Sequence, residues 1–162
     1  MGLYAALAKL DTDNPELHEF WMSMARHEAG HVGALTLIAT LLEQGGPDVE
    51  LVGATDALHD AERAIEALEE EVAAGVARDR AFAIAVELES LELEDLVLDL
   101  IHVLSDSAAR QQAEQLLIHD LSDLSLAIEK FCRDDALLAK ADDLVEARVG
   151  RPERKPVVSR RA

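Results

Sequence analysis

Apolar residues recur at spacings of three and four along most of this chain, which is the period of helices with one buried face. Segments rich in Gly, Pro, Asp and Ser interrupt the pattern and mark where helices begin or end. A loop is predicted over 45–54, with a few extended residues at 48–52, and Gly75 is predicted to end or kink a helix. The pattern predicts helices over 2–10, 15–43, 56–74, 78–104, 108–132 and 134–147.

Four of these helices are long enough to form a bundle, and the short SDS connection before residue 108 forces its two neighbours to be antiparallel. Aromatic residues make up only 3% of the chain, while Ala, Leu, Glu and Asp dominate. That bias favours helices, because unbranched side chains lose little rotamer freedom there. We therefore expect an all-α fold, an antiparallel four-helix bundle with an extra short C-terminal helix over 1–147, followed by a tail at 148–162.

The helix predicted over 15–43 carries the sequence HEAGH inside its apolar stripe. Glu28 and His31 are predicted to point into the core, and His27 lies on the edge of the stripe. A carboxylate and an imidazole in an apolar seam are costly unless they are paired or bind a metal. HEAGH therefore indicates a metal site. The stripe consists of Trp21, Met24, Glu28, His31, Leu35, Ile38 and Leu42.

The helix predicted over 78–104 brings a second acid toward the core. Glu89 is the only acid in its apolar stripe, and Glu94, on a neighbouring stripe, is a reserve candidate. Glu89 is thus the carboxylate that we expect beside HEAGH. The stripe is formed by Val86, Glu89, Leu93, Leu96, Leu100 and Val103.

The helix predicted over 108–132 offers further acids whose roles stay open. Glu114 falls on the apolar stripe, although an acid in the first turns of a helix also suits the helix dipole. Asp120 and Asp123 are interpreted first as part of a solvated face. Three histidines outside HEAGH are interpreted as surface or capping residues: His18, His59 and His102.

Charge is distributed unevenly along the chain. The whole sequence has 15 basic and 33 acidic residues, a net charge of −18, but the tail from Arg148 onward has six basic residues and one acid. Residues 1–147 therefore hold 9 basic and 32 acidic side chains, a charge of about −23 that repels a phosphate backbone and argues against nucleic acid as a partner. The basic tail, with Pro152 and Pro156, is predicted to be disordered.

Cysteine usage and apolar run lengths predict a soluble, cytoplasmic protein. Cys132 is the single cysteine, so an internal disulfide framework is excluded and a reducing compartment fits. The first residues lack the pattern of a signal peptide. The longest apolar run, VGALTLIATLL, is about half the length that a bilayer needs, so we expect no membrane partner.

Two stretches resemble the rubrerythrin-type members of the ferritin-like superfamily. The stretch from LYAALAKL to HEAGHVGALTLI resembles the second half of helix A, the turn and helix B, in which a helix carries A-x-x-E-x-x-H. AIAVELESLELEDLVLDLIHVLSD and the helix after it resemble helices C and D, and together these stretches cover about two thirds of the chain. The resemblance implies a four-helix bundle that holds two irons, with Glu28, His31 and Glu89 as metal ligands.

The sequence departs from that family at two ligand positions. The glutamate of helix A would lie about two turns before Tyr4, ahead of the first residue, and the last helix has Asp120 and Asp123 where a second E-x-x-H is expected. A homodimer in which each chain supplies Glu28, His31 and Glu89 would complete a two-metal site, so we expect a homodimer or a higher homo-oligomer.

The resemblance further implies an oxidase, peroxidase or iron-handling role with iron as cofactor, or manganese or zinc in its place. Because the sequence has no C-x-x-C pair of the rubredoxin type, reduction would need a separate electron donor.

Two other interpretations stay open. HEAGH also matches the H-E-x-x-H motif of zinc metalloproteases, with His27 and His31 as ligands, Glu28 as general base and a third ligand elsewhere. Such enzymes align the substrate on an edge strand, for which 48–52 is the only candidate. The other interpretation is a metal-free helical scaffold whose site has decayed, which fits the two departures from the family.

Overall fold

The computed structural model describes residues 2–43, 49–51, 54–91, 107–149 and 158–160. Its described part contains six helices and two short strands, so the prediction of a helical protein is confirmed. The elements are α1 (Leu3–Leu10), α2 (Pro15–Glu43), β1 (Val49–Leu51), α3 (Ala54–Ala74), α4 (Arg78–Glu89), α6 (Ser107–Phe131), α7 (Asp135–Val149) and β2 (Val158–Arg160).

Helix ends follow local signals that the sequence carries. Asn14 caps α2 through Oδ1, which accepts a hydrogen bond from a backbone N–H of the first turn. Pro15 opens α2, where its missing N–H costs nothing. Gly75 ends α3 with a φ of +91°, a conformation that only glycine adopts easily. Asp134 caps α7 through Oδ1, which accepts hydrogen bonds from two backbone N–H groups at 3.0 Å.

The prediction of a single helix over 78–104 is wrong near its middle, because α4 ends at Glu89. The Ser90 hydroxyl donates a hydrogen bond to the backbone carbonyl four residues earlier, an interaction that competes with regular helix geometry. Residues 92–106, with the reserve candidate Glu94, lie outside the described residues.

Three residues of the predicted tail form a strand. Strand β2 pairs antiparallel with β1, with Glu50 opposite Ser159, so the predicted extended residues are confirmed at 49–51, and residues 158–160 of the predicted tail form a strand. The pairing joins segments more than a hundred residues apart, which composition alone does not reveal. Residues 150–157 lie outside the described residues.

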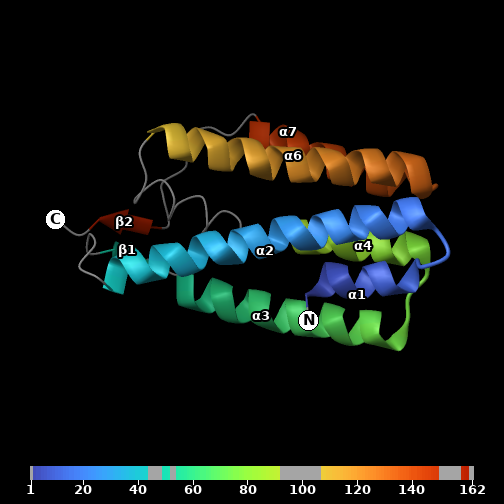
Figure 1. Ribbon diagram of the computed structural model, residues 1–162, viewed down its shortest axis with the longest axis horizontal. Helices are drawn as coiled ribbons and strands as arrows, with labels where there is room; N and C mark the ends of the chain where they lie inside the picture. The colour runs from blue at the N-terminus through green and yellow to red at the C-terminus, as the bar shows by residue number, and fades with distance from the viewer. Residues whose placement is uncertain (1, 44–48, 52–53, 92–106, 150–157, 161–162) are drawn as a thin grey trace.

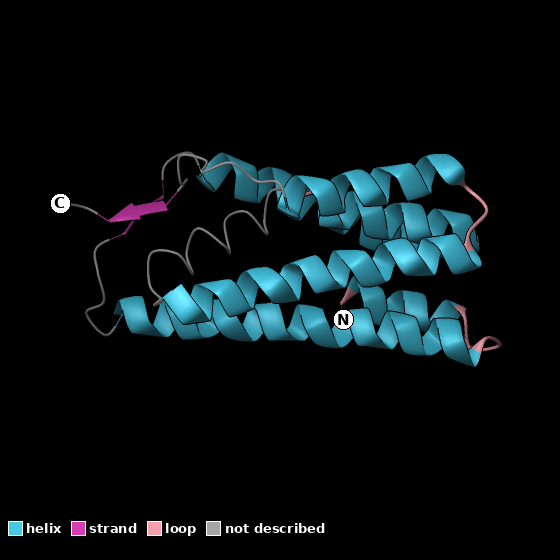
Figure 2. Cartoon of the chain, turned by 90° about the horizontal axis from the view of Figure 1, so that it is seen from above, coloured by secondary structure: helices cyan, strands magenta, loops and turns pink. Residues whose placement is uncertain are grey.

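The helices run along the long axis of the molecule, and the strand pair lies at one end (Figures 1 and 2). Helix α1 packs against α2 and α3. Helix α4 packs against α3, α6 and α7, and α2 packs against α6. Helices α2, α4 and α6 are therefore linked by direct packing through α6.

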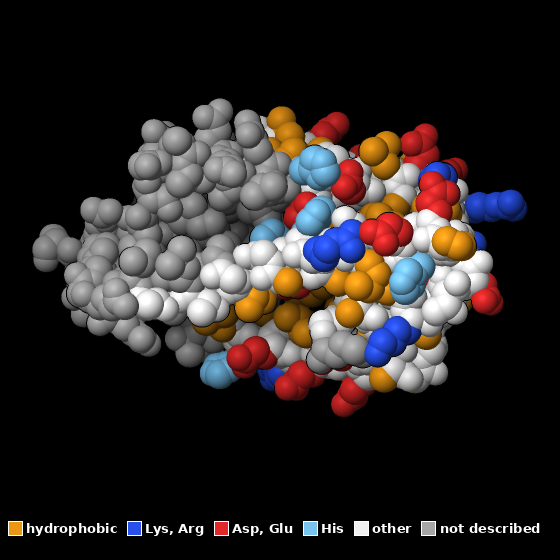
Figure 3. All heavy atoms as spheres, in the orientation of Figure 1, with side chains coloured by type: hydrophobic (Ala, Val, Ile, Leu, Met, Phe, Trp, Pro, Cys, Tyr) orange, Lys and Arg blue, Asp and Glu red, His pale blue; other side chains and the backbone are white. Residues whose placement is uncertain are grey.

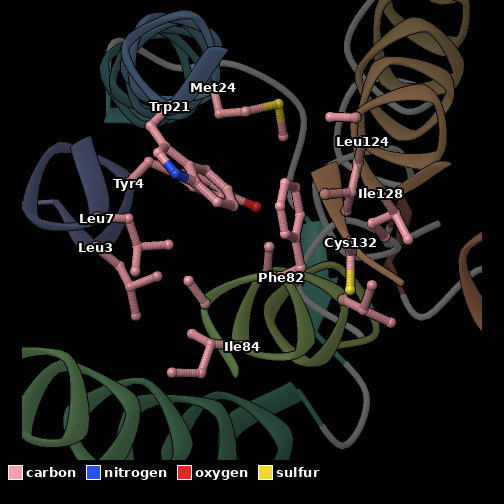
Figure 4. Packing of buried hydrophobic residues seen from close by; sticks show 14 of the residues in the cluster. Leu3, Tyr4, Leu7, Trp21, Met24, Phe82, Ile84, Leu124, Ile128 and Cys132 are labelled. Atoms are coloured by element: carbon pink, nitrogen blue, oxygen red, sulfur yellow. The ribbon is translucent and has the colours of Figure 1, made fainter. Parts of the chain in front are cut away.

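An aromatic cluster forms the centre of the core. Trp21 from α2 lies with its ring centroid 4.9 Å from that of Phe82 in α4 and 6.2 Å from that of Tyr4 in α1 (Figure 4). All three side chains are buried, and the Trp21 Nε1–H donates a hydrogen bond of 3.1 Å to Asp11. These contacts fix α1 against the first half of α2. The largest fully buried aliphatic side chains of the core are Leu7, Leu17, Met24, Ile84, Leu121, Leu124 and Ile128.

Candidate metal centre

Two buried carboxylates lie near two histidines where α2, α4 and α6 meet. Glu89, at the end of α4, and Asp120, in α6, are each 5% exposed and are the buried acids of the described chain. His27 and His31 come from α2, in the turns that follow Met24. Helix α6 packs against both α2 and α4, and its Asp120 interacts electrostatically with His27 and His31 of α2 and with Glu89 of α4.

Asp120 contacts both histidines of HEAGH. Oδ1 of Asp120 lies 2.7 Å from Nδ1 of His27, and Oδ2 lies 3.6 Å from Nε2 of His31. The shorter contact is within hydrogen-bond distance but lacks hydrogen-bond geometry, so Nδ1 of His27 is buried without a hydrogen-bond partner. An orphaned buried nitrogen beside a buried carboxylate is a costly arrangement in a protein interior.

Glu89 is held by a contact from α1. The Tyr4 hydroxyl donates a hydrogen bond to Oε1 of Glu89, and both side chains are buried. The predicted inward position of Glu89 is therefore confirmed. Its negative charge raises the pKa of both His31 and Asp120, which places all three groups within one electrostatic environment.

The pKa shifts reflect the acids around this cluster and the burial of Asp120. The pKa of His31 is raised, mainly by its interaction with Glu28 and further by Asp120 and Glu89, against an opposing effect of burial. Burial raises the pKa of the Asp120 carboxyl and Glu89 adds to it, while His27 and His31 oppose the shift. Both groups thus retain protons more strongly than usual, and a divalent cation could replace those protons.

The predicted inward orientation of Glu28 is wrong. Its side chain is 50% exposed, and its Oε2 lies 3.7 Å from Nδ1 of His31. The cause is the position of α1, which begins at Leu3 and covers α2 near Trp21, where Tyr4 stacks. Glu28 lies about two turns farther along α2. It therefore occupies the solvent-facing rim of the cluster.

The interpretation of Asp120 as a solvated residue is also wrong. Asp120 lies four residues before the buried Leu124 and seven before the buried Ala127, so it shares a face with them. That spacing marks Asp120 as a candidate for burial, while its actual burial depends on the helices that cover this face. Asp123 is half-buried, and the side chain of Glu114 lies outside the described residues.

Donor types in this cluster suit a transition-metal ion, whereas the donor spacings do not match one as placed. Two ligands at about 2.1 Å from one ion, at right or tetrahedral angles, lie about 3.0–3.4 Å apart. The nitrogen–oxygen separations of 2.7 and 3.6 Å around Asp120 lie on either side of that range. As placed, no three His, Cys, Asp or Glu side chains of the described residues surround a common point. Binding would therefore require rotation of the imidazoles about their side-chain bonds.

No known family model, curated protein or solved structure matches this chain. The resemblance to rubrerythrin-type proteins rests on the quoted motifs alone. Within the described ranges, no helix combines the length and the apolarity that a membrane span requires.

Proposed function

We propose that this protein binds a first-row transition metal, with iron preferred, through His27, His31, Asp120 and Glu89. The observation that carries the proposal is the burial of two carboxylates, each 5% exposed, beside two imidazoles of one helix. Burial of a carboxylate without a compensating cation costs roughly several kcal/mol of folding free energy. No lysine or arginine in the described part of the chain forms an ion pair with Glu89 or Asp120.

The proposed framework is a ferritin-like bundle of α1, α2, α4 and α6, taken in the order of family helices A to D. In that assignment α3 belongs to the long crossover connection between the second and third bundle helices, a connection that ferritin-like folds contain. The packing of α1 on α2, of α2 on α6 and of α4 on α6 supports it. The homodimer and the separate electron donor stay predictions.

Each side chain has a distinct role in the proposed centre. Asp120 and the two histidines supply oxygen and nitrogen donors, a mixture suited to iron or manganese. Tyr4 orients Glu89 through its hydrogen bond, and Glu28 lies beside His31 at the solvent-facing rim. A bound iron ion would supply the one-electron chemistry needed for the oxidase or peroxidase activity that the resemblance implies.

Metal analysis of protein purified without chelator tests the proposal. We expect iron or manganese near one ion per chain, and loss of that ion in His31→Ala and Asp120→Asn. His59→Ala is the matched control, because His59 also lies beside an acid but on the exposed surface of α3. Absence of metal from the wild-type protein after reconstitution with iron, manganese and zinc would overturn the proposal.

The exposure of Glu28 favours a second candidate, a zinc hydrolase. His27 and His31 face one carboxylate, so Asp120 would be the third ligand that H-E-x-x-H sites need. The exposed Glu28 lies beside His31, where a general base could contact water. We expect this candidate to show zinc rather than iron and to cleave casein. Glu28→Gln would then abolish cleavage while the zinc stays bound.

The hydrogen bond between Tyr4 and Glu89 favours a third candidate, the metal-free scaffold. It satisfies one buried carboxylate without any ion. This candidate predicts no bound metal and no change of melting temperature when iron, manganese or zinc is added.

A further inference from the structure

Helix α1 covers only one half of the space between α2 and α3. It packs against both helices, whereas α2 and α3 share little direct contact within the described residues. The ring of Tyr4 stacks on Trp21, and the carbonyl oxygen of Ala8 lies 2.7 Å from Nδ1 of His18, so α1 runs antiparallel to α2. Since α1 begins at Leu3, its cover of α2 stops soon after Trp21.

Beyond the start of α1, helix α2 presents an apolar side chain to solvent. Val32 is 55% exposed and lies eleven residues after Trp21, about three turns farther along the same face. The residues around Val32 are small, namely Ala29, Gly33 and Thr36, and a Cβ added at Gly33 would meet no atom within 4 Å. The Thr36 hydroxyl donates a hydrogen bond of 2.8 Å to the Val32 carbonyl, so it is already paired within α2. Another helix could therefore approach this face closely.

Helix α3 supplies the opposite wall of the uncovered space. It packs against α1 and α4, and its Glu71 marks the edge that faces α4, because Glu71 bonds Arg80 at 2.7 Å. Leu58 and Ile65 lie on the other edge of the buried face of α3, and both are half-buried. That edge therefore faces α1 and, beyond the start of α1, the uncovered space.

The surface is hollowed between α2 and α3 beside the start of α1, and hydrophobic side chains lie inside the hollow (Figure 3). The hollow is long enough for a short helix, since the part of α2 from Ala25 to Thr36 spans about 17 Å at 1.5 Å per residue. We name it the α2–α3 groove and define it by its lining residues: Ala29, Val32, Thr36, Leu58 and Ile65.

The charge around the α2–α3 groove is negative. Glu28 of α2 is half-exposed, and Glu62 and Glu69 of α3, which flank Leu58 and Ile65 on the solvent side, are exposed. The single arginine of each helix pairs with an acid of its own helix, and the whole chain carries a net charge of −18. The groove therefore favours a positively charged occupant and repels a second copy of this chain.

We propose that the α2–α3 groove binds an amphipathic helix of another protein, in which Lys or Arg residues border an apolar stripe. The bound helix lies in line with α1 and continues its cover of α2. Its apolar stripe covers Val32, and its cations pair with Glu28, Glu62 or Glu69. The inference does not depend on bound metal, because none of the lining residues is a proposed metal ligand.

Fluorescence anisotropy with two synthetic peptides and the full-length protein tests the charge preference of the groove. The first peptide is a labelled helix of about 14 residues, or four turns, with Leu and Ala on one face and Lys on both sides of that face. The second peptide has Glu in place of every Lys. We expect the Lys peptide to bind at least about 10-fold more tightly than the Glu peptide, because the groove is bordered by acids.

Two matched variants locate the bound peptide. Val32→Asp should weaken binding of the Lys peptide by at least about 10-fold, because it places a carboxylate in the apolar contact. Its added negative charge alone would strengthen that binding. Leu126→Asp is the control, since Leu126 is 62% exposed on α6, and it should change the affinity by less than about 2-fold. Both side chains are exposed, and circular dichroism melting curves check that both variants fold.

Each contrary result overturns the proposal in a different way. Equal effects of Val32→Asp and Leu126→Asp would place the peptide outside the groove. Equal affinities of the Lys and Glu peptides would exclude a basic partner, and lack of binding by either peptide would exclude a helix site. If the wild type sediments as a dimer and Val32→Asp as a monomer, a second copy of the chain occupies the groove instead.

Discussion

Helix α2 crosses two regions that bury very different side chains. Around Trp21, the neighbouring Leu17 and Met24 are at most 2% exposed and pack against hydrocarbon and aromatic rings. In the following turns, His27 and His31 are 33% and 23% exposed and contact a buried carboxylate.

The first region stabilises the fold by removing apolar surface from water, at about 25 cal/mol per Å². The second opposes folding, because charged groups there lose solvent without finding full hydrogen-bonding partners. The two regions follow the same helical period on one helix, so period alone does not distinguish a core from a site. Substitutions in the two regions should therefore change stability and metal binding in different ways.

The largest effect on stability is expected for Trp21→Ala. Trp21 is fully buried and contacts Tyr4, Phe20 and Phe82, so its truncation should cost about 3–5 kcal/mol of unfolding free energy. Urea denaturation measures the loss, and Trp21→Phe, which keeps one ring in place, should cost less. A loss below about 1 kcal/mol in Trp21→Ala would contradict the assignment of this cluster as the main core.

Asp120→Asn should move stability and metal binding in opposite directions. We expect metal affinity to fall by more than about 10-fold, because a charged ligand is lost. The raised pKa of Asp120 means that the folded state keeps this proton to higher pH than the unfolded chain. The wild type therefore loses stability as pH rises from about 3.8 through the pKa of Asp120 in the folded state. The Asn side chain of the variant does not titrate, so the variant lacks that loss.

Denaturation of the wild type and of Asp120→Asn between about pH 4 and 8, with metal removed by a chelator, measures how the unfolding free energy of each depends on pH. Asp120→Asn should show the flatter one and be at least as stable as the wild type near neutral pH. A variant that is less stable throughout would mean that the His27 and His31 contacts outweigh the burial of the carboxylate.

Glu28→Ala should have a smaller effect. Its side chain is 50% exposed, so unfolding free energy should change by less than about 0.5 kcal/mol and metal affinity by only a few-fold. Dialysis of Glu28→Ala and of Asp120→Asn against metal gives the two metal affinities for comparison. An equal loss in both variants would show that Glu28 turns inward when metal binds, as the family resemblance implies.

The smallest effect is expected at the surface link between α3 and α4. Arg80 bonds Glu71 at 2.7 Å and Glu87 at 2.6 Å, and its guanidinium lowers the pKa of Glu71. A lowered pKa adds stability that is present above the unfolded value of 4.5 and is lost as pH falls through the folded pKa.

Arg80→Ala should therefore reduce the acid dependence of unfolding and leave metal binding unchanged. Because the pair is exposed, the difference from the wild type should shrink with added salt. Urea midpoints at several pH values, at low and high salt, check this. A difference that salt does not reduce would point to lost packing of the long side chain instead.

Helix positions could be predicted from the sequence because the signals are local. Asn14, Pro15 and Gly75 act on the backbone within a few residues, and the structure places helix ends beside each of them. Glu89 was recoverable for a similar reason, since it interrupts an apolar stripe as its single acid.

The environments of Glu28 and Asp120 could not be predicted in the same way. Periodicity states which residues share a face of a helix, but not which neighbouring helix covers that face at a given height. The position of α1 near Trp21 leaves Glu28 uncovered, and the packing of α6 on two helices buries Asp120. The pairing of β2 with β1 likewise depends on contacts between distant segments.

The bond between Tyr4 and Glu89 links the beginning of α1 to the last residue of α4. A segment fused ahead of Gly2, such as a purification tag, would be attached close to a buried carboxylate of the candidate centre. A histidine-rich tag there would compete for the same ions and could be mistaken for the site itself. Metal analysis of this protein is therefore best done after every added residue has been removed from its amino terminus.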